Sequence, residues 1–482
     1  MMFGRTTLSA TLALALVACG GGGSSSTPPT AGGPTPVPSP TPSPSPTPTP
    51  TAIEEQLAFA EAVLNEWYLF PDLLDNSVQT SNFNDVQDYL DARVAPARAQ
   101  DIDRFFTFAT SIAEENALIN SGSSAGFGIR LAYDTVNDRV FILEAFENGD
   151  GFQRGLDRGT ELLGIAVPGQ AEQLVSSLMA SGGPQAVVNA LGPNDPGVTR
   201  TLRFAQAGGA VVTADVTKTE FSLDPVSDRY GALVINDGGK QVGYINLRTF
   251  IVADATPQLR TAFADFEAQG ITELIIDFRY NGGGLVSVAE AFGDLMNDGR
   301  AGQIWSETIL RPSKSSENET RLIEDEPNAI APVKIAFIGR GGTASASELV
   351  INSMLSYLDP ANVALIGANT FGKPVGQFGF DLAQFDLRVR ATAFQTVNAD
   401  GDGEYFSGLA GVVPNTCRAD DDIFSPLGDA SEDSIATALD FLAGRSCNPI
   451  SGAGLTGQSA GGRIMLQPHR PDAVQYQIPG FY

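Results

Sequence analysis

The chain has 482 residues, 43% of them hydrophobic, which is enough for two or three domains with apolar cores. Its 29 Lys and Arg residues stand against 56 Asp and Glu residues, giving a formal net charge of -27 at pH 7. This balance argues against binding of nucleic acid or of an anionic membrane through basic patches. We attribute the acidity to solubility, and it says little about a substrate.

The N-terminus has the features of a bacterial export signal. Arg5 precedes an apolar stretch, 8–17, that is too short to span a bilayer. The following Leu-Val-Ala-Cys-Gly order resembles a lipobox, with residues 1–18 as signal peptide and Cys19 as the lipid attachment site; the alternative is an ordinary signal peptide before a chance cysteine. Residues 19–51 are rich in Gly, Ser, Pro and Thr, which predicts an extended tether. We expect a lipid anchor in the cell envelope, on the periplasmic side of the outer membrane.

Two cysteines remain after Cys19, namely Cys417 and Cys447. Export favours a disulfide between them. Two cysteines and the distant His469, the only histidine of the chain, do not make a structural zinc site. We therefore expect a disulfide and no metal.

Apolar spacing divides the rest of the chain into segments. Residues 52–118 have a helical pattern, which continues through Ile102, Phe105, Phe106 and Ile112 and predicts a small helical domain. Residues 209–447 alternate strands with helices, which predicts an α/β core. The expected strands are 242–247, 273–277 and 334–339, and the expected helices are 256–269 and 285–296. The tail 448–482 has low complexity and no function that we assign.

The segment 119–208 is predicted to be β-rich. Its Gly126-Phe127-Gly128-Ile129 loop precedes a strand and is followed by a Gly-Leu-x-x-Gly-Thr segment, an order that resembles a PDZ domain. Such a loop offers backbone N–H groups to the carboxylate of a bound peptide, and its glycines permit close approach. The alternative is a plain β-rich insert whose glycines only form turns.

Ser345 is a candidate nucleophile. It follows a strand and a glycine-rich loop at the expected start of a helix, where free N–H groups stabilise an oxyanion. However, Ser345-x-x-Glu348 also fits a capping box, which needs no catalysis. On this segment alone, capping is the better interpretation.

Lys373 lies 28 residues after Ser345 and is one of only five lysines. A neutral lysine accepts a serine proton when burial lowers its pKa towards 7 to 8. Its neighbours are apolar, although a surface lysine after a strand is the ordinary interpretation. The scarcity of histidine and lysine makes Lys373 the leading candidate for a general base.

Three glycines, 282–284, follow the strand 273–277 and expose N–H groups suited to an oxyanion hole shared with Ala346. The loop lacks the Gly-Lys-Ser/Thr of a nucleotide P-loop. The segment 398–404 is acidic, but Leu409 stands where a calcium-binding EF-hand needs glutamate, so a hairpin turn is the simpler interpretation. We expect no cofactor.

Taken together, these motifs resemble the tail-specific, or C-terminal processing, proteases over about residues 53–444. The residues that carry the resemblance are Asp277-x-Arg279-x-Asn281-x-Gly283-Gly284, Ser345-Ala346-Ser347-Glu348, and Thr370-Phe371-Gly372-Lys373 with Gln377. The family's fold implies a crotonase/Clp-protease-like α/β core with an inserted PDZ domain. Its activity implies a serine endopeptidase with protein or peptide substrates.

The resemblance also implies a role for each site residue. Ser345 would be the nucleophile, Lys373 its base and Gln377 the group that orients the lysine. Gly283 or Gly284 with Ala346 would form the oxyanion hole. The sequence departs from the family in having Gly282 where proline is common and in a Ser–Lys interval a few residues longer.

Three alternatives stay open at this point. Ser347 is a second possible nucleophile. A non-catalytic peptide-binding lipoprotein on the same fold is the main rival function, and a structural envelope protein would explain the tether but not the motifs. The sequence does not define the oligomeric state.

Overall fold

The computed structural model describes residues 51–451, 463–466, 471–478 and 480–482. The predicted signal peptide, the lipid attachment site Cys19, the tether before Thr51 and His469 lie outside these residues. Within them, no helix is both long and apolar enough to cross a membrane.

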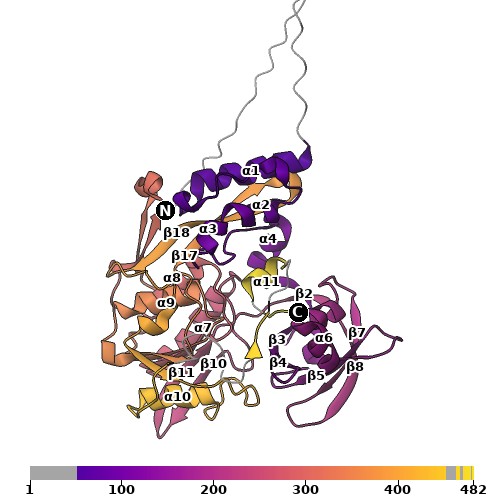
Figure 1. Cartoon of the computed structure of the whole chain (residues 1–482). Coiled ribbons are helices and arrows are strands. Elements are labelled where there is room, and N and C mark those ends of the chain that lie inside the picture. Colours follow the sequence, from indigo (N-terminus) through magenta and orange to yellow (C-terminus); the bar gives the residue numbers. More distant parts are fainter. Residues whose placement is uncertain (1–50, 452–462, 467–470, 479) are drawn as a thin grey trace, which may run out of the picture. The chain divides into compact units, whose positions relative to one another are not determined.

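A six-stranded sheet forms the centre of the α/β core (Figure 1). Its strands, in spatial order, are β10 (Ala232–Asp237), β11 (Lys240–Asn246), β12 (Glu273–Asp277), β15 (Lys334–Gly339), β16 (Val363–Gly367) and β19 (Asn415–Arg418). All neighbours from β11 to β19 pair in parallel, and only β10 is antiparallel. The carboxyl ends of β12, β15 and β16 therefore meet at one edge of the sheet.

Helices cover both faces of this sheet. Apolar residues of α7 (Ala255–Ala268), α8 (Val286–Leu295) and α9 (Ala346–Leu355) share one buried cluster with the sheet, and α10 (Asp433–Leu442) closes a second cluster. Both faces are apolar because parallel strands connected by helices are buried on both sides. The α/β core predicted from alternating patterns is confirmed.

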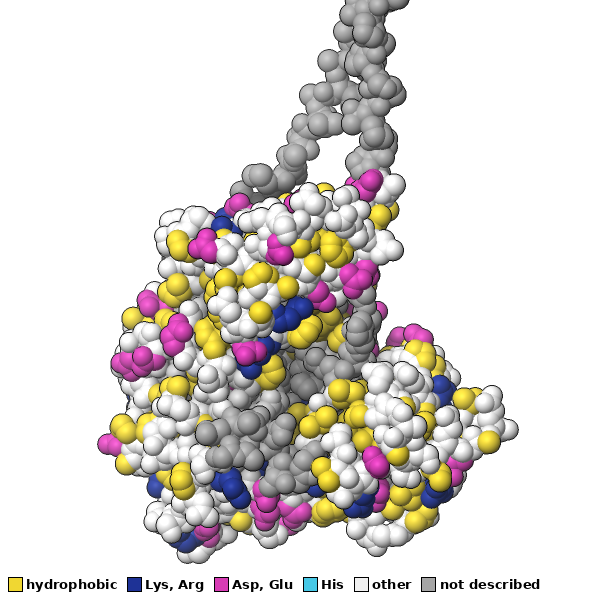
Figure 2. All heavy atoms as spheres, viewed as in Figure 1, with side chains coloured by type: hydrophobic (Ala, Val, Ile, Leu, Met, Phe, Trp, Pro, Cys, Tyr) yellow, Lys and Arg dark blue, Asp and Glu magenta, His cyan; other side chains and the backbone are white. Residues whose placement is uncertain are grey.

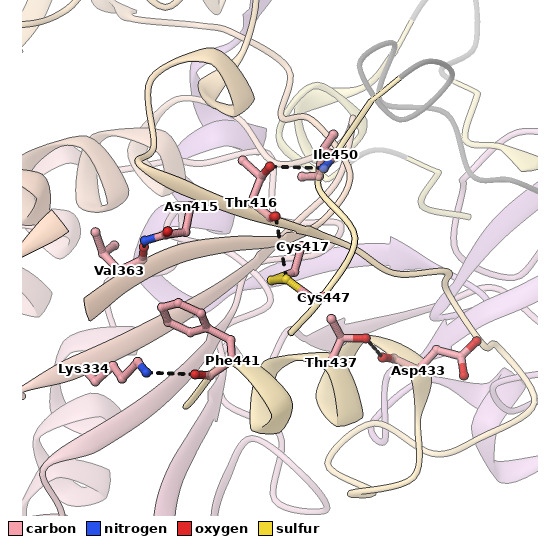
Figure 3. Close-up of a disulfide and its surroundings, with 10 residues drawn as sticks. All are labelled: Lys334, Val363, Asn415, Thr416, Cys417, Asp433, Thr437, Phe441, Cys447 and Ile450. Carbon is pink, nitrogen blue, oxygen red and sulfur yellow. Dashed lines mark hydrogen bonds between the residues drawn. A yellow bond between two sulfur atoms is a disulfide. The ribbon is translucent and has the colours of Figure 1, made fainter. Parts of the chain in front are cut away.

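A disulfide joins Cys417 on β19 to Cys447, which follows α10 (Figure 3). Nearby, the N–H of Ile450 donates to Thr416 Oγ1 at 3.1 Å. The predicted Cys417–Cys447 pairing is present, and it fastens the chain after α10 to the edge of the sheet.

A second sheet lies beside the core and carries the N-terminal helices (Figure 1). It contains β1 (Phe108–Ser111), β18 (Leu387–Asn398), β13 (Ile304–Leu310), β14 (Glu319–Leu322) and β17 (Val375–Leu382). The helices α1 (Ala52–Trp67), α2 (Val86–Arg93) and α3 (Ala95–Arg98) precede β1, and α1 and α2 pack against β18 in one buried cluster. The short helices η1 to η6 lie in connecting loops, at Pro71–Leu73, Thr80–Asn82, Pro312–Glu317, Pro360–Asn362, Ala383–Phe385 and Leu409–Gly411.

The helical pattern expected around 102–112 is not formed. Phe105 has a φ of 64°, and residues 108–111 are the strand β1. The buried Asp103 carboxylate accepts hydrogen bonds from the N–H groups of Phe106 (2.8 Å) and Thr107 (3.2 Å). A side-chain acceptor thus replaces the helical carbonyl acceptors, which explains why apolar spacing alone misjudged this stretch.

Residues 123–222 contain the β-rich segment. Its strands are β2 (Ser123–Gly126), β3 (Ile129–Asp134), β4 (Arg139–Ala145), β5 (Glu161–Ala166), β6 (Gln173–Leu174), β7 (Thr199–Ala205), β8 (Val211–Thr217) and β9 (Thr219–Ser222). Its helices are α5 (Asp150–Gln153) and α6 (Val175–Leu191), and α4 (Ile112–Ser121) precedes it. The strands and α6 enclose their own buried cluster. A β-rich lobe is therefore present, and its identity as a PDZ domain stays a prediction.

The tail contains structure that the sequence did not indicate. Residues Arg463–Ile464 form β20, which pairs with β3, and Ala473–Gln477 form the helix α11. Figure 1 shows the end of the chain beside the β-rich lobe. The last residues lie against β3, where the N–H of Ile129 donates to the Tyr482 carbonyl oxygen at 3.1 Å.

Candidate active site

Three loops meet at the carboxyl edge of the central sheet. The glycine loop follows β12, the Ser345 loop follows β15, and the Lys373 loop follows β16. The adjacent order β12–β15–β16 brings the three loops together although they span almost a hundred residues of sequence. The sheet topology therefore assembles the predicted site.

Ser345 precedes the first residue of α9 and has an unusual backbone conformation. Its φ is 55° and its ψ is -117°, outside the regions that non-glycine residues usually adopt. Holding a residue in such a conformation costs about 1–3 kcal/mol of folding free energy, and strained residues of this kind cluster at functional sites. The side chain is half-buried, whereas Ala346 and Ser347 beside it are buried.

Ser347 is a less suitable nucleophile in this structure. It is fully buried, and its Oγ donates a hydrogen bond to the Asn281 carbonyl oxygen at 3.1 Å. The hydroxyl thereby fastens α9 to the glycine loop. This geometry favours Ser345 over Ser347.

One buried carboxylate joins the serine loop to the lysine loop. Glu348 accepts hydrogen bonds from the N–H of Ser345 (3.1 Å) and the N–H of Lys373 (2.7 Å). It also accepts from Thr370 Oγ1 (2.5 Å) and the N–H of Gly372 (2.7 Å). Burial raises the pKa of Glu348, and these four donors oppose that rise. The glutamate predicted to complete a capping box therefore also positions the lysine loop.

The environment of Lys373 favours the neutral form of its amine. Burial lowers its pKa to about 8, while the charges of Asp103 and Glu348 oppose this lowering. Its Nζ lies 4.9 Å from the centre of the Phe106 ring. A substantial neutral fraction at mildly alkaline pH allows the amine to accept a proton. Among the described residues, no hydrogen bond joins Lys373 Nζ to Ser345 Oγ, so the two groups are not engaged in this conformation.

Gln377 lies on β17, next to a bulge between residues 376 and 377. Its Nε2 donates to the Phe106 carbonyl oxygen at 2.9 Å. Both Gln377 and Lys373 line the same cavity. The structure thus places the glutamine near the lysine, and its amide is held by the backbone of the N-terminal region.

The glycine loop lies directly against the serine. Gly283 has a φ of 103°, and a Cβ there would lie 2.7 Å from Ser345 Cβ and 2.9 Å from the Ala346 nitrogen. Its N–H donates to Asn281 Oδ1 at 2.9 Å. Gly284, with a φ of 139°, packs against the backbone of 250–251. Close approach of this loop to Ser345 explains the need for glycine, and Gly283 has its N–H already engaged.

A cavity of about 600 Å³ opens at this site. Its lining comes from segments far apart in the sequence and includes Lys373 and Gln377 of the predicted site, together with Gly282 and Ala344, which neighbour Gly283 and Ser345 in the sequence. Phe105, Phe106, Phe108 and Phe371 contribute apolar surface to this lining. A cavity with a largely apolar lining and a few polar groups is typical of a binding site.

Sequence reasoning missed Arg104. Its Nη2 donates to the carbonyl oxygens of Phe371 (2.8 Å), Gly372 and Phe406 (3.3 Å), and its guanidinium lies 4.2 Å from the Phe371 ring centre. Arg104 therefore fixes the lysine loop to the N-terminal region. The only signal in the sequence was an arginine in an expected helix, which does not point to contacts more than 260 residues away.

The predicted peptide-binding residues form the turn between β2 and β3. Phe127 is buried, and Gly128 has a φ of 74°. Gly126 and Ile129 lie against Tyr482 of the tail.

On the face shown in Figure 2, acidic and basic side chains of the described residues are interspersed rather than segregated.

Comparisons with known proteins agree with this architecture. Residues 241–416 match the model of peptidase family S41. The chloroplastic C-terminal processing peptidase of Tetradesmus obliquus is 27% identical over 290 residues, covering 57% of each chain. The carboxyl-terminal-processing protease of Synechocystis sp. is 26% identical over 269 residues, covering 55% of this chain and 56% of the relative. The chain thus spans just over half the length of these curated relatives.

A solved structure shares the fold. A candidate S41 protease from Bacteroides fragilis is 18% identical, with a TM-score of 0.62 over 83% of this chain and 99% of that one. The matched segment 241–416 contains β12, β15 and β16 and the three loops that follow them. The family match over residues 241–416 and the curated relatives agree that this part of the chain is similar to peptidase family S41 and its C-terminal processing proteases, and the solved structure shows that the fold is shared.

Proposed function

We propose that the chain is a serine endopeptidase that cleaves peptide bonds through a Ser345–Lys373 acyl-enzyme mechanism. One observation carries the proposal: the backbone N–H groups of a strained serine and of a half-buried lysine with a lowered pKa both donate to the same carboxylate, Glu348, beside one cavity. A serine that only capped a helix would need neither the strain nor the lysine.

The chemistry follows from the roles of these groups. Neutral Lys373 accepts the proton of Ser345 Oγ as the oxygen attacks the peptide carbonyl. The N–H groups of Ala346 and Gly284 stabilise the oxyanion, with Gly283 able to join them if its bond to Asn281 opens. Lys373 then returns the proton to the leaving amine, and water hydrolyses the ester. Because Ser345 and Lys373 are not hydrogen-bonded here, catalysis requires a small rearrangement, as is common in enzymes without substrate.

The substrates that we propose are exported or envelope proteins, recognised through C-terminal or unstructured segments by the β-rich lobe acting as a PDZ domain. Two observations support this assignment: the curated relatives are named as C-terminal processing proteases, and the turn Gly126–Ile129 contains a glycine with a positive φ. An N-terminal lipid at Cys19 would hold the enzyme at the membrane. The alternative, a non-catalytic peptide-binding lipoprotein, gives no role to a strained Ser345 whose loop shares the Glu348 carboxylate with the Lys373 loop.

The test is cleavage of an unfolded protein by the wild-type chain and by Ser345→Ala and Lys373→Ala. Two matched substitutions away from the site, Ser121→Ala and Lys240→Ala, serve as controls. We expect the first two variants to lose cleavage by at least about a thousandfold and the controls to retain it. Cleavage by Ser345→Ala or Lys373→Ala at the wild-type rate would refute the assigned mechanism.

A further inference from the structure

The last three residues of the chain extend the sheet of the β-rich lobe. The N–H of Ile129 donates to the Tyr482 carbonyl oxygen (3.1 Å), and the N–H of Tyr482 donates to the Ile129 carbonyl oxygen (2.9 Å). The N–H of Leu131 donates to the Gly480 carbonyl oxygen at 2.8 Å. The segment therefore runs antiparallel to β3, as a peptide does when it is added to a sheet edge.

The side chain of Tyr482 fills a pocket beside this edge. It is 1% exposed and belongs to the apolar cluster that contains Phe127, Ile129 and Leu191. A Cβ at Gly126 would lie 2.9 Å from the Tyr482 carbonyl carbon. The turn that the sequence assigned to peptide binding is therefore closed around an aromatic residue of the chain itself.

Phe481 points to the other side and is fully buried. Its ring centre lies 5.6 Å from that of Phe146 and 6.0 Å from that of Phe221. Alternate side chains of an added strand enter separate pockets, so the positions of Phe481 and Tyr482 both contribute to which peptide segment is selected.

The same tail also reaches the candidate active site. Tyr476 of α11 stacks on Phe108 with ring centres 3.9 Å apart. Five tail residues line the cavity that contains Lys373, namely Arg463, Ile464, Met465, Tyr476 and Gln477. A Cβ at Gly342, three residues before Ser345, would lie 2.5 Å from Met465 Cε.

We propose that the tail residues 471–478 and 480–482 are an intramolecular ligand of the β3 groove, the space beside β3 that residues 480–482 fill, that this groove selects peptide segments with a Phe-Tyr or similar aromatic pair, and that the tail competes with substrate. The proposal rests on the proposed function only for its consequence, which is restrained proteolysis while the tail is bound. A tethered segment acts at an effective concentration of about millimolar, so even a weak ligand occupies the groove. A substrate with the same aromatic pair must displace the tail to reach both the groove and the cavity.

Peptide binding tests the groove without catalysis. The probe is a fluorescent peptide of residues 471–482, added to chains that carry Ser345→Ala so that nothing is cleaved. We expect the peptide to bind the chain with Tyr482→Asp at least about tenfold more tightly than the chain with an intact tail. A control peptide with Tyr482→Asp should not bind. Equal affinity of the two chains, or binding of the control peptide, would overturn the proposal.

Because Tyr482 is buried, its substitution can also disturb the lobe. A second measurement therefore uses the intact tail: excess free peptide should displace residues 471–482 and accelerate amide hydrogen exchange across α11. Exchange that does not change at saturating peptide overturns the proposal even if Tyr482→Asp fails to fold.

The regulatory consequence needs active chains. Proteolysis of an unfolded substrate should be at least about fivefold faster with Tyr482→Asp than with the wild-type tail. If the peptide binds as expected but cleavage persists in Ser345→Ala, the proposed catalytic function fails and the groove assignment stands. If cleavage needs Ser345 but is unaffected by Tyr482→Asp, the proposed function stands and the competition is refuted.

Discussion

If Lys373 is the general base, the rate of cleavage must follow the fraction of this lysine that is neutral. Burial lowers its pKa to about 8. The neutral fraction is then about 9% at pH 7, half at pH 8 and about 91% at pH 9, so kcat/KM should rise about tenfold from pH 7 to 9 and then level off. A solvated lysine with a pKa of about 10.4 would give about a hundredfold rise with no plateau.

The assay is the initial rate of cleavage of an unfolded protein at concentrations below KM and at constant ionic strength. The Tyr482→Asp chain is measured in parallel, so that release of the tail does not contribute to the profile. Lys373→Arg, whose guanidinium stays charged, should be inactive at every pH. A flat profile, a hundredfold rise without plateau, or activity of Lys373→Arg would refute the role of a buried neutral lysine.

Three further predictions concern the parts that hold the site. Ser345→Gly should remove activity but raise the free energy of unfolding by about 1 kcal/mol, because glycine tolerates the positive φ. Urea unfolding measures this change, and a lower free energy of unfolding for the variant would contradict backbone strain at Ser345. Glu348→Gln should lower kcat at least about tenfold with little change in KM, since an amide cannot accept from all four donors, and unchanged kcat would show that the carboxylate does not position the loops. The double variant Cys417→Ser, Cys447→Ser should have a free energy of unfolding about 3–4 kcal/mol lower than that of the oxidised wild-type chain. Equal free energies of unfolding for the two chains would show that the disulfide does not stabilise the fold.

The elements that the sequence predicted best are those with the strongest local signal. The strands expected at 273–277 and 334–339 are β12 and β15 with the same bounds, and the helix expected at 256–269 is α7, shifted by one residue. Runs of apolar residues in the first two and a helical apolar period in the third specify these elements without reference to the rest of the chain. The glycine loop and the Ser345 loop were located because each follows such an element, whereas the Lys373 loop follows β16, a strand that was not among those expected.

What the sequence could not supply are contacts made across long separations. Arg104 acts on carbonyl groups of the Lys373 loop only because the expected helix is interrupted at Asp103 and Phe105. The tail gave no periodic signal because Gly480–Tyr482 obtain their backbone partners from β3 rather than from their own neighbours. A strand added singly to a distant sheet edge has no pattern of its own to detect.

The sequence posed capping and catalysis by Ser345 as alternatives, and the geometry shows that they are compatible. A cap residue normally has an extended backbone, which serves its purpose without strain. Ser345 instead has a φ of 55°, while Glu348 takes over the N–H groups of both the serine and the lysine loop. The capping box formed by Ser345 and Glu348 therefore holds a strained serine in place in addition to starting the helix. The sharp turn at Ser345 coincides with the close approach of Gly283, where a Cβ would lie 2.7 Å from Ser345 Cβ and 2.9 Å from the Ala346 nitrogen, so strain and tight packing occur at the same residue.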